Sequence, residues 1–104
     1  MPAMTGTKCI PILKALGEIH RLRIVRLLAD EPLGVCEIAR RLKISQYNVS
    51  KHLRILREAG LLEMEPQGKQ RLHVVTATLK NQLPANKNVL ELGCCCFRLD
   101  QLPK

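Results

Sequence analysis

The sequence predicts a mainly α-helical domain with one small β-hairpin, and three features support this fold class. The chain has 104 residues, which is enough for a single domain. Apolar side chains recur at helical spacing over residues 10–56, with turn residues between the runs. Residues 61–75 then alternate loosely around a turn that contains glycine, a pattern typical of a hairpin. No uncharged apolar stretch reaches the roughly 18 to 20 residues that cross a bilayer, so we expect no membrane partner.

The first three helices are expected before residue 43. The first covers residues 10–16 and is short, because Pro11 and Gly17 limit its regularity. The second covers residues 19–29 and ends at Asp30-Glu31-Pro32, since proline cannot continue a helix. The third begins at Val35 and runs for about two turns.

The fourth helix has the clearest boundaries in the sequence. Ser45 is expected to cap its first turn, because a serine hydroxyl can accept a bond from an unpaired amide there. Val49, Leu53 and Leu56 form its buried face, and Gly60 is the expected stop. Strands are expected over residues 61–65 and 71–75, with residues 66–70 as the turn between them.

Basic residues are concentrated in the helical part of the chain. The chain has 17 Lys and Arg residues and nine Asp and Glu residues, which gives a net charge of +8. Between Arg21 and Arg57 there are nine basic residues and three acidic ones. Such an excess attracts polyanions, although charge alone is equally consistent with a solvated surface. The hydrogen-bonding side chains on the polar side of the fourth helix favour a nucleic-acid partner.

Two helices joined by a short turn and followed by a hairpin form the winged helix-turn-helix arrangement. The start of the fourth helix is expected to contact base edges through Gln46, Tyr47, Asn48, Ser50 and Lys51, and the cap residue Ser45 is expected to bind DNA with them. Phosphates are expected to be contacted by His52, Arg54, Arg57 and the hairpin residues Lys69, Gln70 and Arg71. For His52, a structural role inside the protein is an equally good interpretation.

Residues 16–28 and 35–62 resemble the ArsR/SmtB family of bacterial metal- and metalloid-responsive repressors, and the resemblance extends over residues 10–76. Its most specific part is Val49-Ser-Lys-His-Leu-Arg-Ile-Leu-Arg-Glu-Ala-Gly-Leu-Leu62. It implies a homodimer that binds double-stranded operator DNA, and the scarcity of aromatic core residues also favours a dimer. Lys43 departs from the family pattern, because the turn there often carries glycine and a lysine would hold left-handed dihedrals at some cost.

The five cysteines fit a disulfide scaffold poorly, and three of them are adjacent. Cys94, Cys95 and Cys96 are expected to carry thiolate chemistry, whereas Cys9 is expected to be a packed core residue. Arsenic-responsive members of the family often use a Cys-Val-Cys segment at the third helix, of which only Cys36 is present here. The family's site of Asp and His on a fifth helix has no counterpart after Leu79.

The resemblance therefore implies a soft inducer such as trivalent arsenic or antimony, with cadmium or another thiophilic metal as the next choice. The expected site is drawn from Cys94, Cys95 and Cys96, and Cys36 or a cysteine of the other subunit could be a third donor. Tetrahedral zinc completed by His20, His52 or His73 is less favoured, because Cys-x-x-Cys spacings are absent.

We divide the chain into a DNA-binding domain over residues 8–76 and a C-terminal segment over residues 77–104 that serves dimerisation or ligand sensing. The second segment is too sparse in apolar residues for a regular helix. We therefore expect either extended structure around the cysteines or a larger share of the dimer interface for the first helix.

Other functional classes are less well supported. A redox-sensing repressor of the same fold is the nearest alternative. A thiol enzyme is disfavoured, since Cys-x-x-Cys and a paired acid and base are both missing, so we expect no catalytic residues and no catalytic cofactor. A protein-interaction module is disfavoured by the basic face. The start of the chain shows no secretion signal, so a cytoplasmic protein with reduced thiols is expected.

Overall fold

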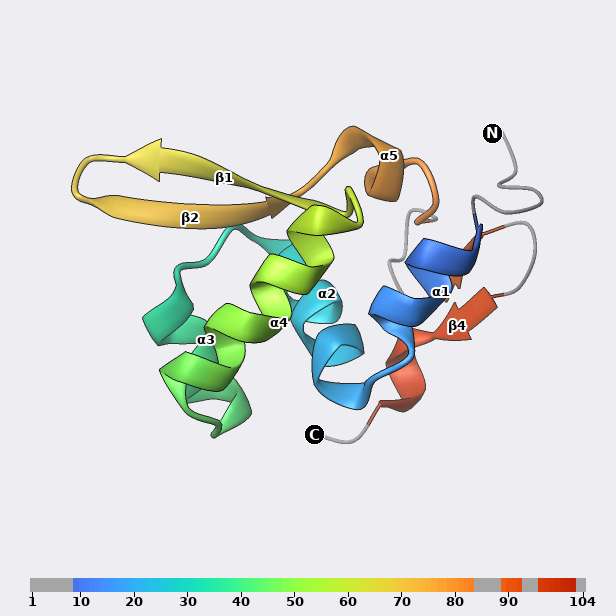
Figure 1. Cartoon of the computed structure of the whole chain (residues 1–104), viewed down its shortest axis with the longest axis horizontal. Coiled ribbons are helices and arrows are strands. Elements are labelled where there is room, and N and C mark those ends of the chain that lie inside the picture. The colour runs from blue at the N-terminus through green and yellow to red at the C-terminus, as the bar shows by residue number, and fades with distance from the viewer. Residues whose placement is uncertain (1–8, 84–88, 93–95, 103–104) are drawn as a thin grey trace.

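The computed structural model describes residues 9–83, 89–92 and 96–102, and its elements confirm the predicted fold class (Figure 1). The helices and strands are α1 (Cys9–Leu16), α2 (Ile19–Asp30), α3 (Val35–Leu42), α4 (Gln46–Glu58), β1 (Leu62–Gln67), β2 (Gln70–Val75), α5 (Ala77–Lys80), β3 (Val89–Glu91), β4 (Cys96–Arg98) and the 3-10 turn η2 (Leu99–Gln101). No helix among the described residues is long and apolar enough to span a bilayer.

The core is aliphatic, as the composition predicts, and α2 contributes to its centre. Ile24 and Val25 of α2 are completely buried, and they belong to the same cluster as Val49, Leu53 and Leu56 of α4. Burying a side chain of this size stabilises the fold by about 1.5–3 kcal/mol relative to leaving it in water. The inner face of α4 is therefore firmly attached to the rest of the protein.

The ends of the helices follow from local chemistry. The backbone N–H of Asn48 donates to Ser45 Oγ at 3.1 Å, which confirms the predicted cap of α4. Gly60 has a φ of +80° directly after that helix, a conformation that glycine adopts without strain. Lys43 ends α3 with φ 59° and ψ 41°, so the expected left-handed lysine is present.

The β1–β2 hairpin is longer than predicted. Its register pairs Leu62 with Val75 and Gln67 with Gln70, which leaves a two-residue turn at positions 68 and 69. The predicted five-residue turn is wrong because Gly68, with a φ of +61°, allows the chain to reverse tightly. Proline at position 66 is tolerated because the ribbon has only two strands and an open side.

A short bridge attaches the hairpin to the helices. The N–H of His73 donates to the carbonyl of Leu33 at 2.8 Å, and the N–H of Leu33 donates back at 3.3 Å. This pairing is not predictable from the sequence, because position 33 lies in a break between two helices. The bridge positions the root of the hairpin beside the start of α3.

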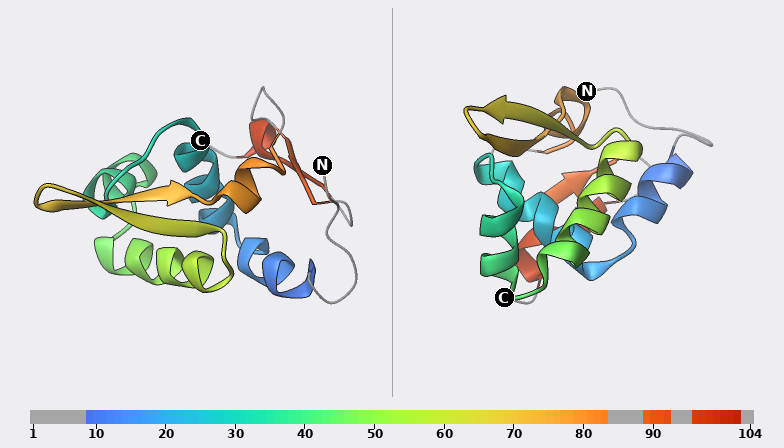
Figure 2. Two further views of the ribbon diagram at one scale, coloured as in Figure 1. Left: turned by 90° about the horizontal axis from the view of Figure 1, so that it is seen from above. Right: turned by 60° about the vertical axis from the view of Figure 1, so that its left-hand side comes forward.

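Two stretches of the C-terminal segment, residues 89–91 and 96–98, are extended, which agrees with one of the two expected alternatives for the part that the structure describes. After the four-residue α5 the described residues form a second hairpin, in which Val89 pairs with Arg98 and Glu91 pairs with Cys96. Leu90, Leu92 and Leu99 are buried in the main core. Figures 1 and 2 place this hairpin and α1 at one end of the molecule, away from the tip of the β1–β2 hairpin.

Candidate nucleic-acid interface

The outer face of α4 is polar and exposed. Gln46, Tyr47, Asn48, Ser50, Lys51 and Arg54 are all exposed, and Arg57 is half-buried. The Lys51 ammonium lies 5.5 Å from the centre of the Tyr47 ring, so the two side chains, one helical turn apart, form a cation–π contact. Because Val49, Leu53 and Leu56 fix the opposite face, the exposed side chains are held on a rigid support.

The hairpin tip lies at the same end of the molecule as the start of α4 (Figures 1 and 2). Lys69, Gln70 and Arg71 at the tip are exposed. A groove of about 780 Å³ separates the hairpin from α3 and α4. Its lining includes Ser50 and Arg57 of α4 together with Gln70 and Arg71 of the hairpin. Of the predicted interface residues, the structure brings Ser50, Arg57, Gln70 and Arg71 to one groove, whereas the lining does not include Gln46, Tyr47, Asn48, Lys51, Arg54 or Lys69.

The basic side chains differ in how far they are already neutralised. Arg54 is paired with Glu58 at 2.9 Å on the same helix. On α3, Glu37 accepts hydrogen bonds from Arg40 and Arg41, and these bonds lower the pKa of Glu37 to about 2. Within the described part of the chain, no ion pair is made by Lys51, Arg57, Lys69 or Arg71. These four are the cations best placed to neutralise phosphates.

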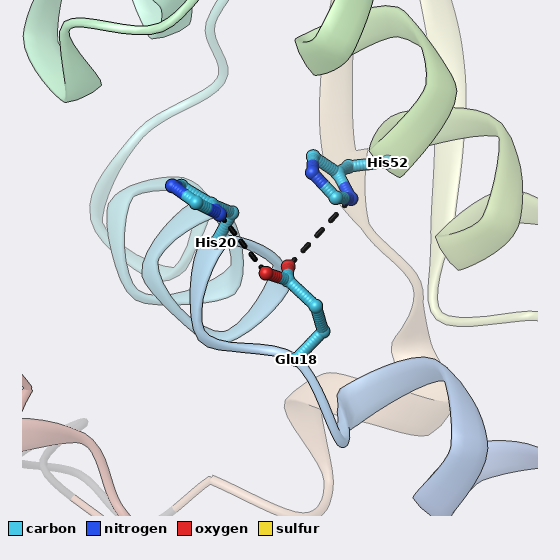
Figure 3. Close-up of side chains that lie close together, drawn as sticks. All are labelled: Glu18, His20 and His52. Atoms are coloured by element: carbon cyan, nitrogen blue, oxygen red, sulfur yellow. Dashed lines mark hydrogen bonds and ion pairs between the residues drawn. The ribbon is translucent and has the colours of Figure 1, made fainter.

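His52 faces the protein rather than the groove. Its side chain is 19% exposed, and its Nδ1 atom lies 3.7 Å from Glu18 Oε2 (Figure 3). The ring stacks on His20 with a centroid separation of 5.6 Å. Burial is the main cause that lowers the pKa of His52, with Arg21, His20 and Lys51 acting in the same direction and Glu18 opposing them. The geometry favours the structural interpretation of this histidine over the phosphate contact.

Glu18 connects these residues and was not singled out from the sequence. It caps α2 by accepting from the N–H of Arg21 at 3.1 Å, and its other oxygen accepts from His20 Nδ1 at 2.9 Å. Partial burial alone would raise the pKa of Glu18, but these hydrogen bonds and the nearby His52 outweigh burial and lower it. The sequence carries no signal for this group, since Glu18 and His52 are 34 positions apart.

The cysteines that the structure describes are Cys9, Cys36 and Cys96, and they lie at both ends of the molecule. Cys36 is a free, exposed thiol that lines the groove, and Cys96 is a free, exposed thiol on β4. Cys9 is buried, as expected, but it is disulfide-bonded, so the expectation that all thiols are reduced and that Cys9 serves packing alone is wrong. Cys94 and Cys95 lie outside the described residues. Since α3 and β4 are at opposite ends in Figure 1, one chain does not bring Cys36 to Cys96, and a donor from a second subunit stays a prediction.

Comparison with known proteins agrees with this architecture. The family model "Bacterial regulatory protein, arsR family" matches residues 20–64. The transcriptional activator HlyU of Vibrio cholerae is 34% identical over 70% of this chain and 68% of its own length. The arsenic resistance transcriptional regulator ArsR1 of Pseudomonas putida is 39% identical over 76% of this chain and 69% of its own.

Two solved structures extend the likeness to the fold. Reduced HlyU from Vibrio cholerae superposes with a TM-score of 0.65 at 32% identity, covering 71% of this chain and 79% of that one. A homodimeric winged helix-turn-helix DNA-binding domain from Mycobacterium bovis superposes with a TM-score of 0.66 at 26% identity, covering 70% of this chain and 68% of that one. These relatives are transcriptional regulators, which confirms the expectation of a non-enzymatic protein. The chain belongs to the ArsR family of bacterial regulatory proteins.

Proposed function

We propose that this protein is a transcriptional repressor that binds operator DNA as a homodimer and leaves it when a thiophilic ligand binds cysteine thiolates. The observation that carries the DNA-binding part is the groove between α4 and the β1–β2 hairpin. Its lining includes Ser50 and Arg57 of α4 and Gln70 and Arg71 of the hairpin, and neither arginine makes an ion pair with another described residue. This pairing suits a duplex, whose bases are read in the major groove while its phosphates are held on either side.

Each exposed residue of the interface is assigned by its chemistry. Gln46 and Asn48, near the start of α4, can each make a bidentate contact with adenine, worth about 1–3 kcal/mol of discrimination. Lys51, Arg57 and the hairpin cations are assigned to phosphates. In a dimer, two copies of α4 would occupy successive major grooves about 34–36 Å apart on a near-palindromic site.

The dimer is supported by the small aliphatic core and by the solved homodimeric relative from Mycobacterium bovis. Ile10 of α1 is 51% exposed, which leaves a large apolar side chain at the end of the molecule remote from the hairpin tip. We therefore assign α1 to the contact between subunits.

The inducer is assigned to the class of trivalent arsenic or antimony, with other thiophilic metals next. Support comes from Cys96, which is free and exposed on β4, and from relatives whose names record arsenic resistance. A coupling of about 3 kcal/mol would lower operator affinity about 150-fold, and operator DNA would weaken ligand binding by the same factor.

The test is a DNA-binding titration of the reduced protein against its own upstream region, repeated with As(III), Sb(III), Cd(II) and Zn(II). We expect salt-dependent binding to DNA and release by As(III) or Sb(III). Serine substitutions at Cys94, Cys95 and Cys96 should abolish release without weakening DNA binding. If all three variants are still released, the sulfur site lies elsewhere, and salt-insensitive binding would contradict the DNA-binding proposal itself.

A redox-sensing repressor is the second candidate. It is favoured by the exposed free thiol of Cys36, which lines the same groove as Arg57 and Arg71, where oxidation would add bulk and polarity. An anaerobic titration with As(III) separates the two candidates, because only ligand binding predicts release without an oxidant.

A further inference from the structure

Three metal-ligating side chains meet between α2 and α4, outside the cysteines (Figure 3). Glu18 caps the start of α2, His20 belongs to its first turn, and His52 extends from the middle of α4. One ligand atom of each residue lies within 4.8 Å of the others. Figure 3 shows both rings turned toward the same carboxylate.

The distances between these atoms are close to those of ligands on one metal ion. Two ligands at about 2.0–2.1 Å from zinc are roughly 3 Å apart at a right angle and roughly 3.4 Å apart at the tetrahedral angle. Here Glu18 Oε1 lies 2.9 Å from His20 Nδ1, and Glu18 Oε2 lies 3.7 Å from His52 Nδ1. An ion could therefore take the place of the proton between Glu18 and His20, and His52 would join it after a side-chain movement, since the three ligand atoms lie within 4.8 Å of one another.

The surroundings of His52 also indicate that a ligand can bind here. Its Nδ1 atom is buried and has no hydrogen-bond partner among the described residues. Buried polar atoms are normally paired, so an unpaired one next to a carboxylate marks a place where a ligand can bind. Because an imidazole lone pair lies in the plane of its ring and the two rings are only 20° from parallel, ligation requires the rings to tilt about their side-chain bonds.

The site is accessible but not fully solvated. The side chains of Glu18, His20 and His52 are 28%, 35% and 19% exposed, so an ion and one or two waters can reach it. Arg21 Nε lies 3.9 Å from Glu18 Oε2, too far for a hydrogen bond, and a cation would have to coexist with this guanidinium. The arginine lowers the affinity that the three ligands would otherwise give.

We propose that Glu18, His20 and His52 form a binding site for a first-row divalent ion of borderline softness, Zn²⁺ in the first place, with water in the remaining position. Two imidazoles and one carboxylate are a ligand set that such ions accept. The ion would connect the start of α2 to α4. This site differs in position and chemistry from the thiolate site proposed above.

Co²⁺ is a suitable probe because thiolate ligands give it intense near-ultraviolet charge-transfer absorption, whereas nitrogen and oxygen ligands give only visible bands. The reduced, metal-free full-length protein is titrated with Co²⁺ without DNA, so the result does not depend on the proposed function. We expect one Co²⁺ per chain with visible bands and no matching thiolate absorption, and Zn²⁺ should displace it.

Variants identify the ligands. Glu18→Gln retains an oxygen that can cap α2, and His20→Gln lies on the helix surface, so both should fold, which circular dichroism checks. Removing a residue that hydrogen-bonds to a metal ligand typically lowers the metal affinity 10–100-fold. Removing a ligand itself should therefore lower the Co²⁺ affinity of this site by at least about 100-fold. Glu63→Gln, an exposed carboxylate on β1, is the matched control and should bind like the wild type. Unchanged Co²⁺ binding by folded Glu18→Gln, or Co²⁺ bound only with thiolate absorption, would overturn the proposal.

Discussion

Arg71 of the β1–β2 hairpin provides a quantitative test of the proposed interface. It is exposed on β2, lines the groove beside α4 and makes no ion pair among the described residues. Its guanidinium is therefore available to a phosphate. In the proposed dimer, the substitution Arg71→Ala should remove one phosphate interaction from each protomer and leave the hairpin register, which depends on backbone pairing, intact.

The size of the effect follows from counterion release. Each neutralised phosphate contributes about −0.9 to the slope of log K against log salt, so removing one such interaction from each protomer of a dimer makes the slope less negative by about 1.8. Between 50 and 200 mM salt, the wild type should then lose about tenfold more affinity than the variant. Operator and scrambled duplexes should be affected alike, because an interaction with phosphate carries no sequence information.

Fluorescence anisotropy at several salt concentrations measures both quantities. Gln46→Ala is the complementary variant: its slope should equal that of the wild type, while its preference for operator over scrambled DNA falls by about 1–3 kcal/mol for each base that Gln46 reads. Lys80→Ala, an exposed cation on α5, is the control for net charge alone. An unchanged slope in Arg71→Ala, or equal weakening on both duplexes in Gln46→Ala, would refute the assignment.

Three further predictions concern stability and assembly. Lys43→Gly should raise the melting temperature by a few degrees in a thermal scan, because a left-handed non-glycine residue costs about 1–2 kcal/mol. The greater freedom of glycine in the unfolded chain offsets only part of this gain in stability. A lower melting temperature would contradict the reasoning. Burial, and then the charge of Arg57, lowers the pKa of His73 below its ordinary value of 6.5. The unfolded chain therefore binds a proton at His73 more readily than the folded chain does. As a result, the free energy of unfolding is highest above pH 6.5, where His73 is neutral in both states, and it falls as the pH drops below 6.5. Urea unfolding at pH 7.5 and 5.5 should show a smaller loss on acidification in His73→Gln than in the wild type, and equal losses would remove this explanation. Ile10→Lys should shift the protein toward monomer in sedimentation experiments, and an unaltered dimer would exclude α1 from the interface.

Features governed by neighbouring residues were predictable from the sequence. Ser45 and Gly60 delimit α4 through a side-chain cap and a positive φ, and both effects act within a few residues of the helix end. The left-handed lysine at position 43 was foreseen from the family resemblance, because the turn there often carries glycine. The hairpin turn was predicted less well, because composition indicates that a turn occurs, whereas strand register decides where it begins.

Features that depend on contacts between distant segments were not predictable. Nothing near His52 in the sequence indicates that Glu18 will face it, since this contact exists only after α2 and α4 have packed together. The bridge between Leu33 and His73 has the same origin. The donors of the thiolate site remain a prediction, and of the three adjacent cysteines the structure describes Cys96 alone.

The packing of α4 also limits how a ligand could regulate DNA binding. Val49, Leu53 and Leu56 are at most 1% exposed, and exposing all three would cost about 5–9 kcal/mol. A coupling of about 3 kcal/mol is sufficient for 150-fold regulation. A ligand that displaced α4 from its own domain would have to supply more free energy than regulation requires. In the proposed dimer, we therefore expect the proposed inducer to act between protomers, where a small rotation would change the separation of the two copies of α4 and leave the core of each protomer intact.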